Sequence, residues 1–256
     1  MSVSPRHALA VWQRNLAMYS RTWKLNILPN FFEPVFYLAA VGIGVGAYIQ
    51  EMDGMSYLEF LAPGLVCVAA MNGASYEATY NVFVRLTFDK AYDAMLTTPI
   101  EPDDVLAGEV LWSMTRATIY GGCFYLIIVL WGLAPLPSSL LAIPAMLLAG
   151  LLFSAIGLAF SFYIESIDLF SFYFTLFLTP LFLFSDVFFP LEERLTPLWQ
   201  WVAELLPLLH PVRLARTAFR GDGSALLVAW DIFYIVAFSA MLLAFARRQA
   251  YRRLTS

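Results

Sequence analysis

The chain has 256 residues, of which 61% are apolar and 13% charged, and its formal net charge is −4. Soluble domains average about 45–50% apolar and about 25% charged residues, so this composition excludes disorder and argues against a soluble enzyme. The slight acidity leaves no basic field for nucleic acid. We therefore expect an all-α membrane protein.

Six long apolar segments account for most of the hydrophobicity. They cover residues 31–49, 57–80, 110–131, 140–162, 169–189 and 225–246. Each is close to the roughly 17–25 residues that a helix needs to cross a ~30 Å hydrocarbon core. The short alternating pattern of a transmembrane β-barrel is missing. The sequence therefore predicts six transmembrane helices.

An amphipathic segment precedes the first predicted span. Leu9, Trp12, Leu16, Tyr19 and Trp23 recur every three or four residues along residues 6–28. The pattern, with basic residues on the other face, predicts a helix in the membrane interface, as a unit of residues 1–30 ahead of a transmembrane domain of residues 31–256. A helix packed on a partner protein fits the same pattern. We expect Pro29 to end this helix and, without a signal-peptide core, no cleaved leader.

A second amphipathic segment lies in the long connection after the second span. Residues 88–96 place Phe88, Tyr92, Met95 and Leu96 on one helical face, and the segment also carries Asp89 and Asp93. An apolar face without a core of its own needs the membrane, the rest of the protein or a partner.

Residues 191–223 predict two short helices before the last span. The first carries an apolar stripe made of Leu195, Leu198, Trp199, Val202, Leu205 and Leu206. The second aligns Arg213, Arg216 and Arg220 on one face. Both are too short to cross a bilayer, so we expect a re-entrant hairpin at the outer interface. The arginines could receive a phosphate, bind lipid head groups, or balance Glu192, Glu193 and Glu204.

The basic residues indicate an orientation. With six spans, both chain ends and the connection after the second span share one side. That side carries Arg6, Arg14, Arg21, Lys24, Arg85, Lys90, Arg247, Arg248, Arg252 and Arg253. The other side carries Arg194, Arg213, Arg216 and Arg220. The positive-inside rule predicts that both termini are cytoplasmic.

Motifs for catalysis are missing from the sequence. It has no GxxxxGK[ST] phosphate loop, no HExxH and no GxSxG, and its two histidines cannot form a histidine cluster. Cys67 and Cys123 lie within predicted spans and suggest neither a disulfide framework nor a metal pair. We expect no cofactor or metal on this chain.

The predicted spans contain six charged residues, which are Glu33, Glu59, Glu77, Arg116, Asp186 and Asp231. Charges inside a membrane segment are candidates for function, but all six lie near enough to a span end to reach the interface. The fifth span is rich in aromatic residues, among them Phe172, Tyr173, Phe177 and Phe184. They could line a path for an amphiphile, stack on sugars, or pack against lipid and neighbouring helices.

At this point the chain resembles a known family, the type-2 ABC exporter permeases, and within it the nodulation-factor-export branch. The stretches that carry the resemblance are EPVFYL (33–38) with the following Gly-x-Gly-x-Gly, SYLEFLAPG (56–64), YDAMLTTP (92–99), LAGE (106–109), TPLFLFS (179–185) and LLPLLHP (205–211). The motifs are weak one by one, and their order over six spans makes the resemblance specific.

The resemblance implies partners and roles. It implies a homodimer joined to two copies of a separate ABC ATPase subunit, which would bind ATP and Mg²⁺. The segment from Phe88 to Leu96, with Asp89 and Asp93, would be the coupling helix seated in the ATPase. Tyr37, Phe172, Tyr173, Phe177 and Phe184 would lie along the substrate path, and Trp199, Arg213, Arg216 and Arg220 in an outer gate. The acidic link at Glu165 and Asp168 departs from an ordinary inner loop.

We therefore expect the permease subunit of an ATP-driven exporter that moves an amphiphile, such as a lipidated oligosaccharide, a lipid or a hydrophobic drug, across the inner membrane. A multispan transferase or an ion-coupled carrier are the alternatives. A transferase would need clustered catalytic side chains, and a carrier would need inverted repeats with charges at the membrane midplane.

Overall fold

The computed structural model describes residues 3–49, 51–191 and 196–254. In chain order its elements are α1 (Pro5–Gly44), β1 (Glu51–Met52), β2 (Met55–Ser56), α2 (Tyr57–Tyr76), η1 (Glu77–Asn81), η2 (Val84–Phe88), α3 (Ala91–Leu96), α4 (Pro102–Leu130), η3 (Ser138–Leu141), α5 (Ala142–Tyr163), α6 (Leu169–Phe172), η4 (Tyr173–Leu178), α7 (Thr179–Phe184), α9 (Pro197–Ala203), α10 (Leu209–Arg220) and α11 (Ala225–Leu254). Apart from one two-stranded hairpin, these elements are helical, as expected.

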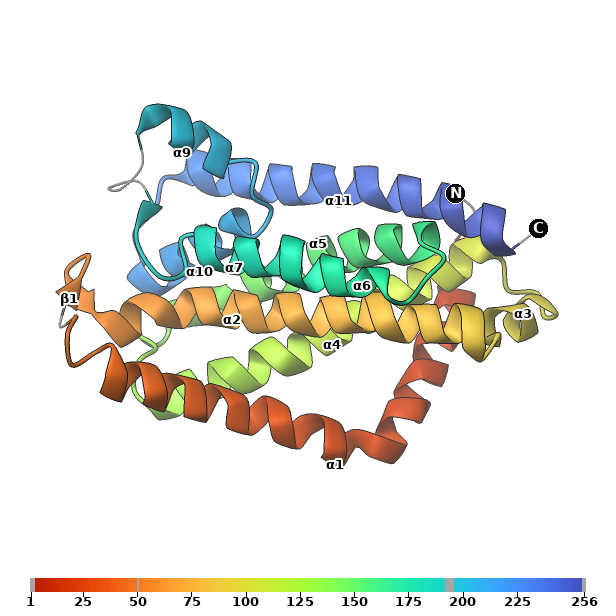
Figure 1. Cartoon of the computed structure of the whole chain (residues 1–256), viewed down its shortest axis with the longest axis horizontal. Helices are drawn as coiled ribbons and strands as arrows, with labels where there is room; N and C mark the ends of the chain where they lie inside the picture. Colours follow the sequence, from red (N-terminus) through yellow and green to blue (C-terminus); the bar gives the residue numbers. More distant parts are fainter. Residues whose placement is uncertain (1–2, 50, 192–195, 255–256) are drawn as a thin grey trace.

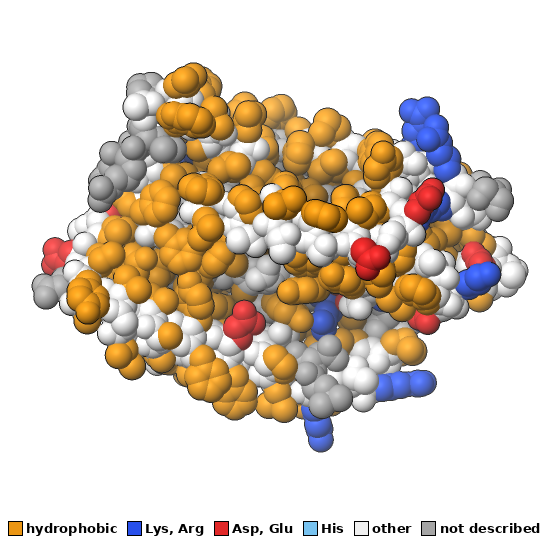
Figure 2. Space-filling model, viewed as in Figure 1, with side chains coloured by type: hydrophobic (Ala, Val, Ile, Leu, Met, Phe, Trp, Pro, Cys, Tyr) orange, Lys and Arg blue, Asp and Glu red, His pale blue; other side chains and the backbone are white. Residues whose placement is uncertain are grey.

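The long helices run along the length of the molecule (Figure 1). Both chain termini and α3 lie at one end, which we name the termini end. The β1–β2 hairpin, α9 and α10 lie at the other, which we name the hairpin end. Apolar side chains cover most of the face in Figure 2, and most charged side chains visible there gather near the two ends, as expected for a bundle with a membrane belt.

Five helices in the described part of the chain are long and apolar enough to cross a membrane. They are Ile27–Gly44, Tyr57–Phe88, Pro102–Leu130, Ser138–Tyr163 and Ala225–Leu254. The segment predicted as the fifth span forms a shorter apolar helix, Leu169–Phe184. The second span is longer than predicted because the helix continues through η1 and η2 to Phe88.

The prediction that Pro29 ends the first helix is wrong. The helix α1 runs unbroken from Pro5 to Gly44 with Pro29 and Pro34 inside it. It bends sharply along its course (Figure 1). Proline removes one backbone hydrogen bond and bends a helix without having to end it.

The N-terminal part of α1 packs on α4. Val11 is buried, whereas Leu9 and Leu16 on the predicted apolar face are exposed. Trp12, also on that face, donates a hydrogen bond from Nε1 to Thr115 Oγ1 at 2.9 Å. The predicted face is therefore divided between a contact with α4 and an exposed surface.

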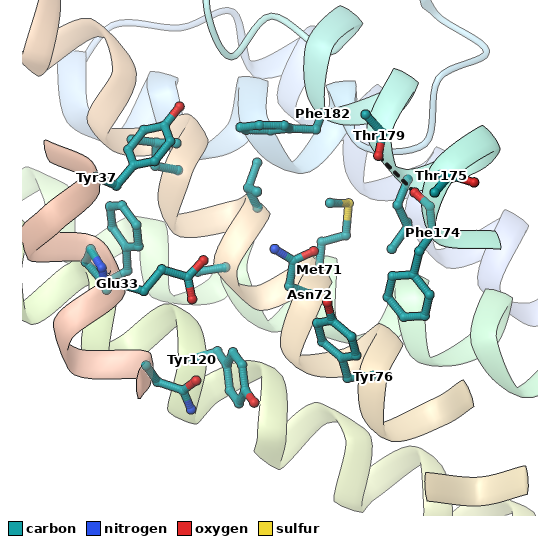
Figure 3. A pocket seen from close by; sticks show the side chains of 17 residues that line it. Glu33, Tyr37, Met71, Asn72, Tyr76, Tyr120, Phe174, Thr175, Thr179 and Phe182 are labelled. Carbon is teal, nitrogen blue, oxygen red and sulfur yellow. Dashed lines mark hydrogen bonds between the residues drawn. The ribbon is translucent and has the colours of Figure 1, made fainter. Parts of the chain in front are cut away.

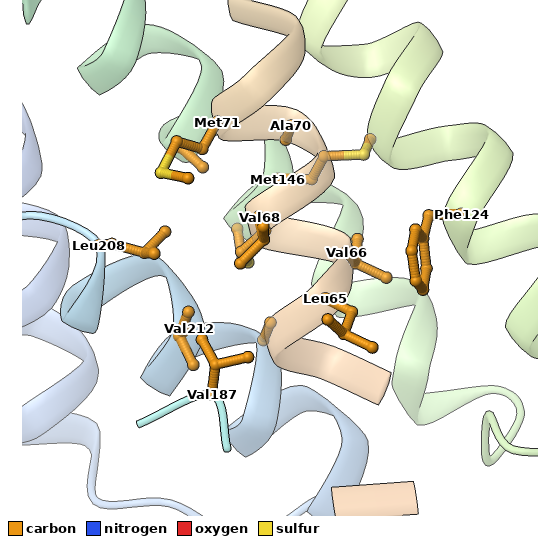
Figure 4. Packing of buried hydrophobic residues seen from close by; sticks show 14 of the residues in the cluster. Leu65, Val66, Val68, Ala70, Met71, Phe124, Met146, Val187, Leu208 and Val212 are labelled. Carbon is orange, nitrogen blue, oxygen red and sulfur yellow. The ribbon is translucent and has the colours of Figure 1, made fainter. Parts of the chain in front are cut away.

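The helix α2 forms the centre of the bundle, with Leu65, Val66 and Met71 almost fully buried. Figure 4 shows it surrounded by side chains from several elements. They include Phe124 of α4, Met146 of α5, Val212 of α10 and the loop residues Val187 and Leu208, all buried. Ser56 and Glu59 start α2 with a reciprocal capping box, which gives the in-span charge of Glu59 a structural role.

Glycine allows α1 to approach α4 closely. A Cβ at Gly108 would lie 2.5 Å from Val11 Cβ and 2.8 Å from the Ala8 carbonyl oxygen. Gly122, on the same helix, has nothing within 4 Å of its Cβ position. The two glycines therefore provide a matched pair for testing this contact.

We expect Gly108→Ala to destabilise the protein by about 1–3 kcal/mol, because the added methyl group overpacks the α1–α4 contact. Gly122→Ala should leave stability unchanged or raise it slightly, since alanine favours a helix. Thermal unfolding of both variants in the same detergent measures this. Equal melting temperatures for the two variants would contradict the close contact.

Candidate functional site

A buried polar network lies at the termini end, where α1, α2, α3 and α4 meet. We name Asn15, Glu77, Arg85, Tyr92 and Glu109 the termini-end network. Arg85 Nη2 donates to Glu77 Oε1 at 2.8 Å and to Glu109 Oε2 at 2.7 Å. Glu109 also accepts from Tyr92 Oη at 3.0 Å and from Asn15 Nδ2 at 3.1 Å. Three segments, α1, η2 and α3, thus donate to one carboxylate of α4 that has no exposed surface.

The network changes the interpretation of α3. Tyr92 is 0% exposed and points into the protein, and Met95 packs against the same buried cluster, so the rest of the protein is the expected covering that these two residues of the face meet. Phe88 is 63% exposed, and Met95 and Leu96 are half-buried. Asp89 and Asp93 are exposed. The segment 88–96 is therefore fixed to the protein interior through Tyr92, and its outer surface begins at Phe88, the last residue of η2.

Arg116 extends the polar cluster further into the bundle. Its side chain is 5% exposed, and its Nε lies 3.4 Å from Glu77 Oε2. Its guanidinium carbon lies 4.5 Å from the Tyr19 ring centroid and 5.1 Å from that of Tyr120. Arg116 is therefore buried inside the protein, where a carboxylate and two aromatic faces surround it.

A pocket of about 380 Å³ lies between α1, α2, α4, η4 and α7. Figure 3 shows Glu33 and Tyr37 from α1, Asn72 and Tyr76 from α2, and Tyr120 from α4 around it. Phe174, Thr175, Thr179 and Phe182 form the opposite wall. The pocket thus combines aromatic rings with a carboxylate, an amide and hydroxyl groups.

The predicted substrate-path residues meet this pocket only in part. Tyr37 lines it, whereas Phe172, Tyr173, Phe177 and Phe184 do not. Tyr173 is buried 3.2 Å from Ser75 Oγ, and Phe172 and Phe184 are exposed. The pocket is thus lined by other residues of the same helix, because an aromatic-rich segment does not reveal which face a π-helical turn presents, and the assignment of the substrate path stays a prediction.

At the hairpin end, the arginine row of α10 pairs with carboxylates from four segments. Arg213 donates to Glu204 Oε1 at 2.5 Å and to Asp231 Oδ2 at 3.0 Å. Arg216 donates to Asp186 Oδ2 at 2.8 Å, and Arg220 pairs with Asp53 in the hairpin turn. We name these ion pairs the α10 clamp. Of the roles predicted for these arginines, the ion pairs agree with the balancing of nearby carboxylates, and Glu204 is one of the partners expected from the sequence.

His210 links the same helix to α11. Its Nε2 lies 3.0 Å from the Glu204 carbonyl oxygen, which can only accept, so this nitrogen carries a proton. Its Nδ1 lies 2.8 Å from Asp231 Oδ1, and its ring stacks on Tyr234 at 3.7 Å. The α10 clamp and His210 thus satisfy Asp231, whose charge would otherwise lie within the last span.

A wider cavity of about 1060 Å³ opens beside the α10 clamp, and Trp201 and Trp230 contribute to its walls. Trp199, predicted in the outer gate, is 57% exposed on α9 and does not line the cavity. The predictions for Glu192, Glu193, Arg194 and Leu195 lie outside the described residues. The acidic link at Glu165 and Asp168 is exposed.

These features define a multi-pass helical membrane protein with an internal pocket and polar networks at both ends. A family model for the ABC-2 type transporter matches residues 6–219. Nodulation protein J of Rhizobium leguminosarum bv. viciae is 33% identical over 95% of both chains, and that of Sinorhizobium fredii is 34% identical over 93% of this chain and 92% of its own. The inner membrane transport permease YadH of Escherichia coli is 26% identical over 90% of each chain.

The chain therefore belongs to the ABC-2 type transporter family, and it is a transport permease. The resemblance to the branch that contains nodulation protein J is confirmed. The family assignment favours the permease over the transferase and the ion-coupled carrier.

We expect Glu109→Gln to destabilise the protein by about 3–5 kcal/mol, because it leaves Arg85 buried with only one carboxylate. Tyr92→Phe removes the hydrogen bond to Glu109 and the longer one from Arg85 while keeping the ring, so its cost should be only about 1–2 kcal/mol. Asp93→Asn, at an exposed site on α3, is the control. Chemical unfolding in detergent compares the three, and an equal loss for Glu109→Gln and Asp93→Asn would disprove the role of the network.

Acidification should loosen the hairpin end. Burial works against ionisation of Glu204, but hydrogen bonds and the charge of Arg213 outweigh it and hold the pKa of this carboxyl below its usual value. The stabilisation is therefore complete above the ordinary carboxyl pKa and is lost as pH falls through the lower pKa of the folded state. Trp230 donates to Glu204 Oε2 at 3.2 Å, so tryptophan fluorescence should change in that acid range. Glu204→Gln should abolish the transition, and its persistence in that variant would refute this assignment.

Proposed function

We propose that this chain is the membrane subunit of an ATP-driven exporter and that it works as a homodimer with two copies of a separate ABC ATPase. The proposal places the protein in the bacterial inner membrane with six spans and cytoplasmic termini. ATP and Mg²⁺ bind the partner subunit, and this chain contributes no catalytic group or cofactor site. Its family membership supports the association with an ATPase.

The observation that carries this proposal is the two-sided environment of α3. Phe88 and the carboxylates Asp89 and Asp93 are exposed at the termini end. On the same segment, the Tyr92 hydroxyl donates a hydrogen bond to Glu109 of α4 and accepts one from Arg85 of η2. A partner that presses on the outer surface therefore acts on a helix already bonded to two long helices. This is the arrangement that a coupling helix requires.

The pocket supports a route for an amphiphile. It lies beside the exposed apolar surfaces of α1 and of the Leu169–Phe184 helix, where Phe36 and Leu176 are 68% and 69% exposed. An amphiphile could keep its apolar tail against these surfaces while its polar group enters the pocket. We assign the shorter helix, Leu169–Phe184, as the fifth of the six spans, with the loop that follows it completing the crossing.

The hairpin end supports an outer gate. Leu198, Trp201 and Leu205 expose apolar surface on and just after α9. The α10 clamp holds the neighbouring helix through ion pairs to four other segments. We propose that α9 and α10 form a re-entrant hairpin at the outer interface, where exposed aromatic rings contact head groups.

The first test is co-purification. The tagged chain, extracted from its own membranes, should bring an ATPase subunit with it, and native mass spectrometry should give two copies of each. Phe88→Ala should weaken this association about tenfold or more, because it truncates an exposed aromatic anchor. Tyr92→Phe should retain the ATPase but reduce transport per ATP hydrolysed, since it cuts only the internal connection of α3.

These two variants separate binding from coupling. Wild-type affinity for the ATPase in Phe88→Ala would contradict the docking surface. Full transport in Tyr92→Phe would contradict the internal connection. A chain that purifies without any ATPase subunit and moves substrate without ATP would overturn the proposed function.

A further inference from the structure

Glu33 differs from the other charges of the predicted spans. Glu59 caps α2, and Glu77 and Arg116 belong to the polar cluster at the termini end. Asp186 and Asp231 belong to the α10 clamp. Glu33 instead directs its carboxylate into the pocket, toward Asn72 and Met71 (Figure 3). Its position is therefore explained by none of the contacts that stabilise the bundle.

The pocket has a negative electrostatic character. Among the residues described as lining it, Glu33 is the sole charged side chain, and none is Lys, Arg or His. Arg116, the nearby cation on α4, is paired with Glu77. Glu33 is exposed at the rim of the pocket, where an amphiphile can reach it, and a carboxylate within a membrane span is stabilised by an opposite charge or by hydrogen-bond donors. Because the lining supplies no cation, a cationic ligand would complement it.

The aromatic rings around the pocket also favour a cationic ligand. Tyr37, Tyr76 and Phe174 contribute aromatic faces, and Tyr76 and Phe174 stack with centroids 4.6 Å apart. Aromatic faces attract ammonium groups through their quadrupoles. Asn72 adds an amide that can bond a neighbouring hydroxyl or amine of the ligand. The carboxylate and the aromatic rings thus both favour a positively charged ligand.

We propose that this pocket binds the protonated amine of an amphiphile, with the ammonium group on Glu33 and between the tyrosine rings. The inference rests on the proposed transport function and deepens it by naming the chemical class of the substrate head group. The volume of about 380 Å³ suits a head group better than a whole lipid. The ammonium can belong to a simple alkylamine or to an amino sugar.

The test uses the full-length permease in nanodiscs without any ATPase. Dansylcadaverine, a fluorescent amine, serves as the reporter, and three octyl compounds compete with it. Octylamine carries an ammonium group, octyl 2-amino-2-deoxyglucoside carries an ammonium group on a sugar, and octyl glucoside carries the sugar without charge. We expect the amines to compete about tenfold or more better than octyl glucoside.

Glu33→Gln has nearly the same shape and should weaken amine binding about tenfold while leaving octyl glucoside unchanged. Glu33→Asp should recover part of the affinity. Glu51→Gln, an equal loss of charge on the exposed strand β1, should leave binding unchanged. Melting temperatures verify that each variant is folded.

The outcomes discriminate clearly. Competition by both amines supports a general ammonium site, and competition by the amino sugar alone supports the same site with a sugar requirement. Equal competition by octyl glucoside, or wild-type amine affinity in Glu33→Gln, overturns the proposal. Since binding is measured without the ATPase, failure here leaves the exporter proposal intact, and failure of ATPase co-purification leaves this binding result intact.

Discussion

The charge of Arg85 must be neutralised inside an apolar bundle, and much of the termini end follows from that constraint. Glu77 and Glu109 both reach this guanidinium, which fixes the end of α2 against α4. The Glu109 carboxylate also accepts hydrogen bonds from Tyr92 of α3 and Asn15 of α1, and these bonds orient both side chains. Removing one member would leave buried charges without compensation, so these four segments are expected to move together.

At the hairpin end, arginines are also neutralised by carboxylates, but in a different arrangement. Three arginines on one face of α10 each meet a carboxylate from a different part of the chain, and Arg216 also lies over the Phe60 ring at 3.9 Å. The two polar ends are joined by the apolar length of α2, which is buried on most sides. The pocket opens between these two polar ends, along the stretch of the bundle where apolar packing dominates.

The parts of this fold that could be predicted are those that local pattern determines. Apolar length identified the five long helices that could cross a membrane, and helical spacing identified α3, α9 and α10. The sequence could not show that Tyr92 points inward, because spacing assigns residues to a face without saying what covers it. Pairs such as Asn15 with Glu109 were also beyond reach, since one sequence contains no record of which distant residues meet. For the same reason Glu33 was recognised as a charge in a span but not as part of a pocket wall.

The unbroken course of α1 has a mechanical consequence. One arm of this helix is fastened to α4 near Gly108, and the other carries Glu33 and Tyr37 on the wall of the pocket. Because the helix bends without ending, its two arms are connected by continuous helical backbone. The angle between them can change while the remaining backbone hydrogen bonds stay intact. A small tilt of α4 at the termini end would swing the far arm and alter the width of the pocket.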